Sequence, residues 1–318
     1  MRGLRSLCLV ALLSTIGTIG LAIAPRKIAG IRSANAYANG VTFNVLGGVN
    51  GAGWGNTGGL ESVSFLRDKI WQYAYSTGDW PTTVATQETC TDLDPNTLDQ
   101  YAFLIGQLVF TVGNYVTEQY MSSATACPQN GLTVFGRADG TWGDPWVTRY
   151  VYGNQVPGHA RKLLCIRPSL WVLNYVSCST HLENNFISTV DDVAHLQLGE
   201  LNNFVHDYSV FTGVQAGGDF NISIQCNWPY PASTCGSNYL SSNLVTWFNF
   251  NGATNHWEAG VSPYSVTYPT QGSDIPEKLD HFGRSAPFQY LASPSRFRGM
   301  GSSGNYVSDH WMLRVYIG

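Results

Sequence analysis

The middle of the chain constrains the fold most, because short β-prone runs follow one another there without a helix between them. Residues 132–135, 162–166 and 171–180 are runs of this kind, separated by turn residues. Strands that neighbour one another in this way, in a chain that also contains helical stretches, predict a mixed β-sheet with helices packed outside it. Periodicity alone predicts this mixed α and β class and leaves the topology open.

Three other stretches have apolar residues at the spacing of a helix. The first begins near Leu60, the second spans residues 94–109 with Asn96 or Thr97 as its cap, and the third spans residues 188–208. Strand-like runs stand before, between and after these stretches. They lie at residues 41–46, 83–86, 214–220, 279–283 and 311–317.

The N-terminus has the pattern of an export signal. Arg2 and Arg5 form a basic start, and residues 7–24 are an almost uninterrupted apolar run. Small residues follow, so cleavage is expected after Ala36 or Ala38. The alternative is a membrane anchor, because the apolar run approaches spanning length.

Cleavage would separate a signal peptide, residues 1–38, from one domain, residues 39–318, and would make the mature protein a secreted one. It removes five of the 17 basic side chains and none of the 21 acidic ones, which leaves 12 basic residues and a formal charge of −9. A basic patch is the usual footprint of a nucleic-acid binder, so the bulk charge gives no support for one. A bound divalent cation and a local cluster of arginines could still hold one phosphate.

Six cysteines remain after the signal, and an even number in an exported chain indicates disulfides. Two lie on adjacent β-prone runs, two close a short loop, and the remaining two would pair by elimination. A zinc site is disfavoured because no C-x-x-C or C-x-x-H spacing occurs. In that order the pairs are Cys165 with Cys178, Cys226 with Cys235, and Cys90 with Cys127.

Short polar segments beside the β-prone runs carry the chemistry. Carboxylates and imidazoles at strand ends can meet at one edge of a sheet, where hydrolysis of a phosphodiester needs a cation, a base and an acid. Carboxylate and amide oxygens also suit Mg²⁺. The segments are F-N-V at 43–45, Q-E-T at 87–89, S-T-H-L at 179–182, G-G-D-F-N at 217–221 and S-D-H at 308–310, with K-L-D-H-F at 278–282 as a weaker sixth.

The order and spelling of these segments resemble the signature of the endonuclease/exonuclease/phosphatase family, over residues 41–317. That family includes DNase I-like nucleases, sphingomyelinases and inositol-phosphate phosphatases. The resemblance implies an α+β fold, the DNase I-like four-layer sandwich of two packed mixed β-sheets flanked by helices. It also implies a metal-dependent phosphodiesterase that uses Mg²⁺, with Mn²⁺ or Ca²⁺ as alternatives.

The resemblance assigns roles to five positions at the metal and the nucleophile. Glu88 would be the main metal ligand, with Asn44 and Asp309 also at the metal. Asp309 would orient His310, which activates water or stabilises the attacked phosphate. Asp219 resembles the acid that positions the nucleophile. For Asn44, a buried structural amide is the alternative.

Four further positions follow from the resemblance. Asn221 would bind the phosphoryl oxygen beside the nucleophile. His181 would contact the phosphate or protonate the leaving group, unless it is a core histidine. Asp280 matches an acid that orients a catalytic histidine, although the next residue is a histidine where an aromatic is common. Arg137 either clamps phosphate or is only a cation at a strand end, because its strand lacks the family's serine.

The substrate has three candidate classes. We expect a secreted endonuclease acting on nucleic acid. A sphingomyelinase or another phospholipid or phosphoinositide phosphodiesterase is the alternative, with residues 245–250 as an exposed apolar hairpin or, equally, a buried strand. A non-catalytic binding protein is disfavoured because no core catalytic position is lost. No protein partner is implied, and we expect a monomer.

Overall fold

A computed structural model describes the chain over residues 38–45, 59–77, 80–91, 99–108, 112–120, 129–136, 146–157, 160–167, 175–183, 193–209, 213–221, 280–284, 290–297, 299, 307–308, 310 and 312–317. All of them belong to the unit Ala36–Gly318. None of the helices among these residues has the length and apolar character needed to cross a membrane.

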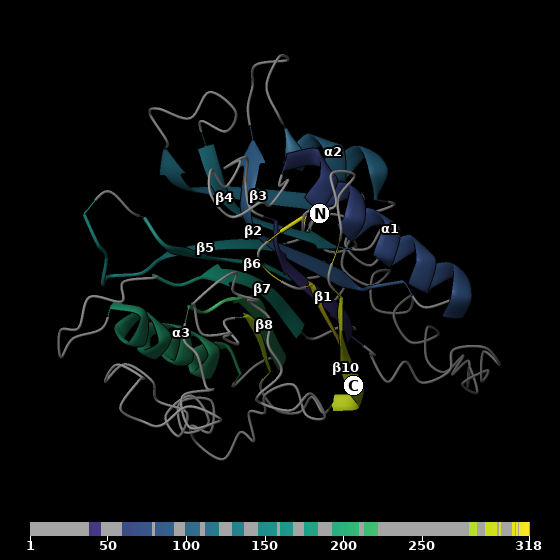
Figure 1. The fold of residues 1–318 in the computed structure, drawn as a ribbon. Helices are drawn as coiled ribbons and strands as arrows, with labels where there is room; N and C mark the ends of the chain where they lie inside the picture. The colour runs from purple at the N-terminus through teal and green to yellow at the C-terminus, as the bar shows by residue number, and fades with distance from the viewer. Residues whose placement is uncertain are drawn as a thin grey trace, which may run out of the picture. The chain divides into compact units, whose positions relative to one another are not determined.

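Two mixed β-sheets lie at the centre of this unit (Figure 1). In each sheet one neighbouring pair of strands is parallel, and the other pairs are antiparallel. The first sheet has the order β10 (Tyr290–Phe297), β11 (Met312–Ile317), β1 (Ala38–Asn44), β2 (Thr83–Thr91), β4 (Gln129–Gly136) and β3 (Val112–Tyr120). The second has the order β5 (Trp146–Val151), β6 (Lys162–Arg167), β7 (Tyr175–His181), β8 (Gly213–Asp219) and β9 (Asp280–Arg284).

Helices cover the outer faces of the two sheets. Helices α1 (Gly59–Thr77) and α2 (Gln100–Gln107) share an apolar core with β1, β2 and β4, whereas α3 (Val193–Ser209) shares another with β6, β7 and β8. Figure 1 accordingly shows α3 on the opposite side of the sheets from α1 and α2. The predicted α+β four-layer sandwich, with two packed mixed β-sheets flanked by helices, is confirmed.

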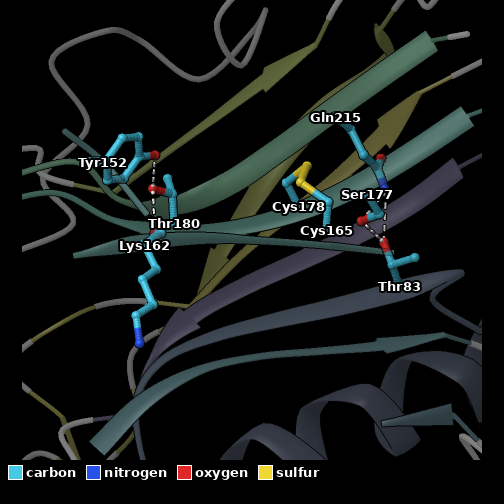
Figure 2. Close-up of a disulfide and its surroundings, with 8 residues drawn as sticks. All are labelled: Thr83, Tyr152, Lys162, Cys165, Ser177, Cys178, Thr180 and Gln215. Carbon is cyan, nitrogen blue, oxygen red and sulfur yellow. Dashed lines mark hydrogen bonds between the residues drawn. A yellow bond between two sulfur atoms is a disulfide. The ribbon is translucent and has the colours of Figure 1, made fainter. Parts of the chain in front are cut away.

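The layer between the two sheets is polar. Successive side chains of a strand point to opposite faces, so apolar residues face the helices and polar residues face the other sheet. The hydroxyl of Ser177 donates to Thr83 Oγ1 at 3.0 Å, and Gln215 Nε2 donates to the same oxygen at 2.7 Å (Figure 2). Gln87 Nε2 donates to Ser179 Oγ at 2.9 Å. These hydrogen bonds join the sheets and satisfy buried groups that would otherwise destabilise the fold.

Glycines allow a close approach inside this layer. A Cβ at Gly217 would lie 2.9 Å from atoms of both Phe282 and Thr42. A Cβ at Gly218 would meet the backbone oxygen of Thr180 on the neighbouring strand. The two glycines before Asp219 are therefore required by packing, and they bring the end of β8 close to its neighbours.

The predicted disulfide between Cys165 and Cys178 is formed. These residues are direct partners on β6 and β7 and lie in the core shared with α3 (Figure 2). Cys90 is disulfide-bonded as well. Cys127, Cys226 and Cys235 lie outside the described residues.

Several predicted element boundaries were wrong. Strand β2 does not end after Thr86 but continues to Thr91, because a bulge accommodates one extra residue of β2 and the ladder then resumes. Helix α2 starts at Gln100 rather than near residue 97, because Asp99 Oδ1 accepts a hydrogen bond from the Ala102 N–H at 2.7 Å. The sequence pattern also missed β3, β5 and β10. Each is a terminal strand of its sheet, where alternation is weak.

Candidate active site

Strand alternation and sheet topology place three predicted residues at one edge of the polar layer. Asn44, His181 and Asp219 are the last residues of β1, β7 and β8, and each faces the other sheet. Strands β7 and β8 are parallel, with His181 directly opposite Asp219. Asp280, the first residue of antiparallel β9, stands opposite Asp219 on its other side. The carboxyl ends of parallel strands thus bring these side chains together.

A bulge in β2 aims Glu88 into the same region. The pairing of β2 with β4 shifts between Thr86 and Thr89, so two residues of β2 face one residue of β4. Glu88 takes a φ of 52°, which is the left-handed region that L-residues disfavour. Asn221, just after β8, has a φ of 49°, which asparagine tolerates better. Unusual backbone at two positions of one cluster is typical of a functional site.

The Asn44 amide links the two carboxylates nearest to it. Its Nδ2 donates to Glu88 Oε1 and to Asp219 Oδ2, each at 3.1 Å. Carboxylate oxygens only accept, so the amide nitrogen is the atom that faces them. Asn44 therefore holds the two acids at a fixed separation.

His310 lies between two carboxylates. Its Nδ1 is 2.8 Å from Asp280 Oδ2, and its Nε2 is 3.4 Å from Asp219 Oδ2. The backbone before it is fixed to β1, because Ser308 Oγ donates to the Asn44 carbonyl at 2.7 Å and accepts from the His310 N–H at 3.1 Å. Among the described residues, Asp280 is the carboxylate within hydrogen-bond distance of the ring.

His181 faces the cluster from the other side. Its Nε2 lies 3.7 Å from Asp219 Oδ2 and 3.9 Å from Glu88 Oε1. Its Nδ1 is 2.6 Å from Nη1 of Arg161, a residue whose own charge is paired with Glu183 at 3.6 Å. His181 is buried, and it shares the site with the acids rather than with the apolar core.

Asn221 links the end of β8 to the residue that follows β7 through hydrogen bonds. Its backbone N–H donates to Asp219 Oδ1 at 2.9 Å, and its Nδ2 donates to the Leu182 carbonyl at 2.8 Å. Phe220, which lies between Asp219 and Asn221 in the sequence, packs edge-on against His281 with the ring centroids 5.5 Å apart.

Asp219 is the electrostatic centre of the cluster. Burial, the largest single influence, raises the pKa of its carboxyl, whereas the adjacent His310 and His181 rings lower it. Hydrogen bonds from the Asn221 N–H and the Asn44 amide also lower this pKa, and the net result is a pKa below the ordinary value. Asp219 is therefore a carboxylate at neutral pH although it is almost completely buried.

The donor set fits a divalent cation. Carboxylate oxygens and ring nitrogens of Glu88, His181 and Asp219 all lie within 4.8 Å of one another, and so do those of Asp219, Asp280 and His310. Carboxylate oxygens predominate, as Mg²⁺, Mn²⁺ and Ca²⁺ prefer. The Glu88 side chain is 23% exposed, whereas that of Asp219 is only 2% exposed, so solvent reaches the cluster from the Glu88 side.

The structure brings together most of the residues that the sequence analysis proposed, and it adds others. Arg137 and Asp309 lie outside the described residues. No sequence motif marks the pair formed by Arg161 and Glu183. The residues brought together are Asn44, Glu88, His181, Asp219, Asn221, Asp280 and His310.

Solved structures share this fold, although no protein-family model and no curated protein matches the sequence. An endonuclease/exonuclease/phosphatase from Beutenbergia cavernae DSM 12333 has a TM-score of 0.61 at 17% identity, over 88% of this chain and 71% of that chain. TDP2 from D. rerio, solved with a single strand DNA product, has a TM-score of 0.57 at 13% identity, over 89% and 100%. A mannosyl-6-phosphatase from Bacteroides thetaiotaomicron VPI-5482 has a TM-score of 0.55 at 11% identity, over 88% and 99%. At these identities the likeness shows the fold alone.

Proposed function

We propose that this chain, which has the endonuclease/exonuclease/phosphatase fold, is a divalent-metal-dependent hydrolase of phosphoester bonds. The observation that carries the proposal is the convergence of Glu88, Asp219, Asp280 and two histidines at the edge where the two sheets meet. These residues come from five separate segments of the chain. They also occupy the positions that the sequence motifs assign to catalysis.

The residues divide into a metal-holding side and a proton-handling side. Glu88 and Asp219 would hold the cation, which when bound supplies positive charge to the phosphate oxygens. Asn44 keeps the two acids in place from behind. On the other side, His310 is held through Nδ1 by Asp280, so its Nε2 points toward Asp219. There, Nε2 can accept the proton of an attacking water.

We propose nucleic acid as the substrate class and an endonuclease as the activity. The TDP2 structure with a DNA product supports the choice of a nucleic acid, and the mannosyl-6-phosphatase shows that the same fold serves phosphate monoesters. The apolar run at residues 245–250, whose exposure as a hairpin would favour a phospholipid substrate, lies outside the described residues. Export also belongs to this proposal, and N-terminal sequencing of the secreted protein would locate cleavage after Ala36 or Ala38.

The experiment compares substrates and variants of the secreted protein. Plasmid DNA, RNA, sphingomyelin, a nitrophenyl phosphodiester and the matching monoester are each incubated with Mg²⁺, Mn²⁺ or Ca²⁺, and with EDTA. We expect cleavage of the diester and of nucleic acid with metal, and none with EDTA. His310→Ala should lower the rate by roughly 10²–10⁴-fold, as expected for loss of a general base.

Matched carboxylate variants separate chemistry from folding. Asp219→Asn removes a buried charge from the site, whereas Asp68→Asn removes a 66% exposed one on α1. We expect activity to be lost in the first variant only, while both keep the circular dichroism of the parent protein. A fully active His310→Ala, or equal activity in the two Asp variants, would contradict the proposal.

A further inference from the structure

A buried ion pair stands behind His181. Arg161, at the end of the segment before β6, places Nη1 2.6 Å from His181 Nδ1 and Nε 3.6 Å from Glu183 Oε2. The side chains of Arg161 and Glu183 are only 9% and 1% exposed. Desolvating two charges consumes most of their attraction, so a buried ion pair is weak evidence for stability. Its contact with a site residue points instead to a role in the site.

The hydrogen bond to His181 has a fixed direction. A guanidinium has donors and no acceptor, so Arg161 donates and His181 Nδ1 accepts. The imidazole proton of His181 is then on Nε2. That nitrogen is the one that faces Asp219 Oδ2 and Glu88 Oε1. His181 therefore presents an N–H to the cluster.

His310 has the opposite arrangement. Its Nδ1 lies 2.8 Å from Asp280 Oδ2, and an ionised carboxylate can only accept. The proton is then on Nδ1, and Nε2 of the neutral ring is an acceptor. One histidine of the site is thus held as a donor and the other as an acceptor, by partners of opposite charge.

The surroundings of Arg161 fix it in place. The Gln155 side chain forms two hydrogen bonds with the Arg161 backbone. Its Oε1 accepts from the Arg161 N–H and its Nε2 donates to the Arg161 carbonyl, each at 2.8 Å. Gln197 of α3 accepts from the Glu183 N–H at 2.8 Å and donates to the Asn154 carbonyl at 2.7 Å. Helix α3 and the β5–β6 connection therefore hold both members of the ion pair.

We propose that Arg161, held by Glu183, is a positioning residue that keeps His181 in the Nε2–H tautomer, so that His181 donates a hydrogen bond to an oxygen of the bound phosphoester. The consequence for the reaction rate rests on the proposed hydrolase function. The effect on the His181 ring does not, and it is measurable without metal or substrate. A role for Arg161 in packing alone would leave the tautomer unchanged.

The test reads the tautomer by NMR. Long-range proton–nitrogen spectra of the ¹⁵N-labelled, metal-free protein distinguish the two ring nitrogens, and the His181 signals are those lost in His181→Gln. The variant is Arg161→Met combined with Glu183→Leu, which removes both charges together and leaves no unpaired charge buried. We expect a single Nε2–H tautomer in the parent protein and a mixture of tautomers in the double variant. Arg161→Lys, which keeps a donor and a charge, is the matched control and should retain the parent tautomer. If the double variant does not fold, the parent spectrum is the second readout, because an Nδ1–H tautomer of His181 there would overturn the proposal.

Kinetics complete the test. In the metal-loaded enzyme, kcat of the double variant on the nitrophenyl diester should fall roughly 10–100-fold with little change in KM, as for other groups that orient a site residue from behind. An unchanged tautomer, two protonated ring nitrogens in the parent, or a shifted tautomer with unchanged kcat would each overturn the proposal. If the tautomer changes in the double variant but the parent protein hydrolyses no phosphoester, the proposed function is refuted and the Arg161–His181 link still holds.

Discussion

The left-handed backbone at Glu88 predicts that a glycine at this position gives a more stable protein than an alanine does. We compare Glu88→Gly with Glu88→Ala, because both remove the carboxylate and its hydrogen bond from Asn44. The difference between the two variants therefore isolates the backbone. The φ of 52° lies where glycine is unstrained and where an L-residue is not.

The size of the effect follows from two opposing terms. The left-handed conformation costs an L-residue about 1–2 kcal/mol. A glycine makes the unfolded chain more flexible, which lowers the stability of the protein by about 0.4–1 kcal/mol relative to alanine. The free energy of unfolding of Glu88→Gly should therefore exceed that of Glu88→Ala by about 1 kcal/mol, or about 2 °C in Tm for a domain of this size.

The assay is urea unfolding in EDTA with the disulfides intact, followed by circular dichroism and tryptophan fluorescence. The control pair is Gln72→Gly and Gln72→Ala, at an exposed position in the middle of α1. In a helix, alanine is favoured over glycine by about 1 kcal/mol, so the sign there should be reversed. Both Glu88 variants should lose phosphoester hydrolysis.

One outcome refutes the reasoning. If Glu88→Ala is as stable as Glu88→Gly while the Gln72 pair shows its normal order, the backbone at Glu88 is not held in the left-handed region. The bulge in β2 would then not be what aims this carboxylate at the site.

Three further predictions concern packing, charge and covalent structure. Gly217→Ala should lower the free energy of unfolding by about 1–3 kcal/mol, because its Cβ would overpack the layer between the sheets. The control is Gly106→Ala in α2, where the new Cβ would meet open space, and it should raise the free energy of unfolding by up to about 1 kcal/mol in the same urea titration. Burial raises the pKa of Glu200, but three hydrogen bonds from the segment between β5 and β6 and one from Tyr150 of β5 lower it more, so the folded pKa is below the ordinary value of 4.5. The stability that Glu200 contributes is present above the pKa of the unfolded state and is lost as pH falls through the pKa of the folded state. The Tm of Glu200→Gln should therefore lie below that of the parent protein at pH 7, and the difference should disappear in acid. A difference in Tm that does not depend on pH would contradict this. Replacing Cys165 and Cys178 together by alanine should cost about 3 kcal/mol, as for a closed loop of this length, and the resulting difference in Tm from the parent protein should disappear when both proteins are reduced.

Local patterns in the sequence were enough for most of the fold's elements. The parallel and central strands have strong β-prone runs, and β7 and β8 were placed close to their observed bounds. Three of the four terminal strands, β3, β5 and β10, were missed, whereas the terminal strand β9 was predicted at residues 279–283. Strand β10 contains Pro294, which is tolerated at such an edge and weakens the strand pattern further.

The candidate site was predictable where a motif is contiguous, as at His181, Asp219 and His310. It was not predictable where a contact joins distant segments. Arg161 belongs to no motif, and only the register of β6 against β7 brings it to His181. The sequence also offered two acids for His310, and the contact with Asp280 became visible only once β9 was paired with β8.

The sequence by itself determined the order of the polar segments, the apolar faces turned to the helices and the pairing of Cys165 with Cys178. Each depends on neighbours a few residues apart or on one hairpin, so a local pattern carries it. Only the tertiary structure decided the backbone of Glu88, the polar layer between the sheets and the opposite tautomers of the two histidines. These depend on how strands far apart in the chain pair, and strand register is fixed by the packing of the whole sandwich.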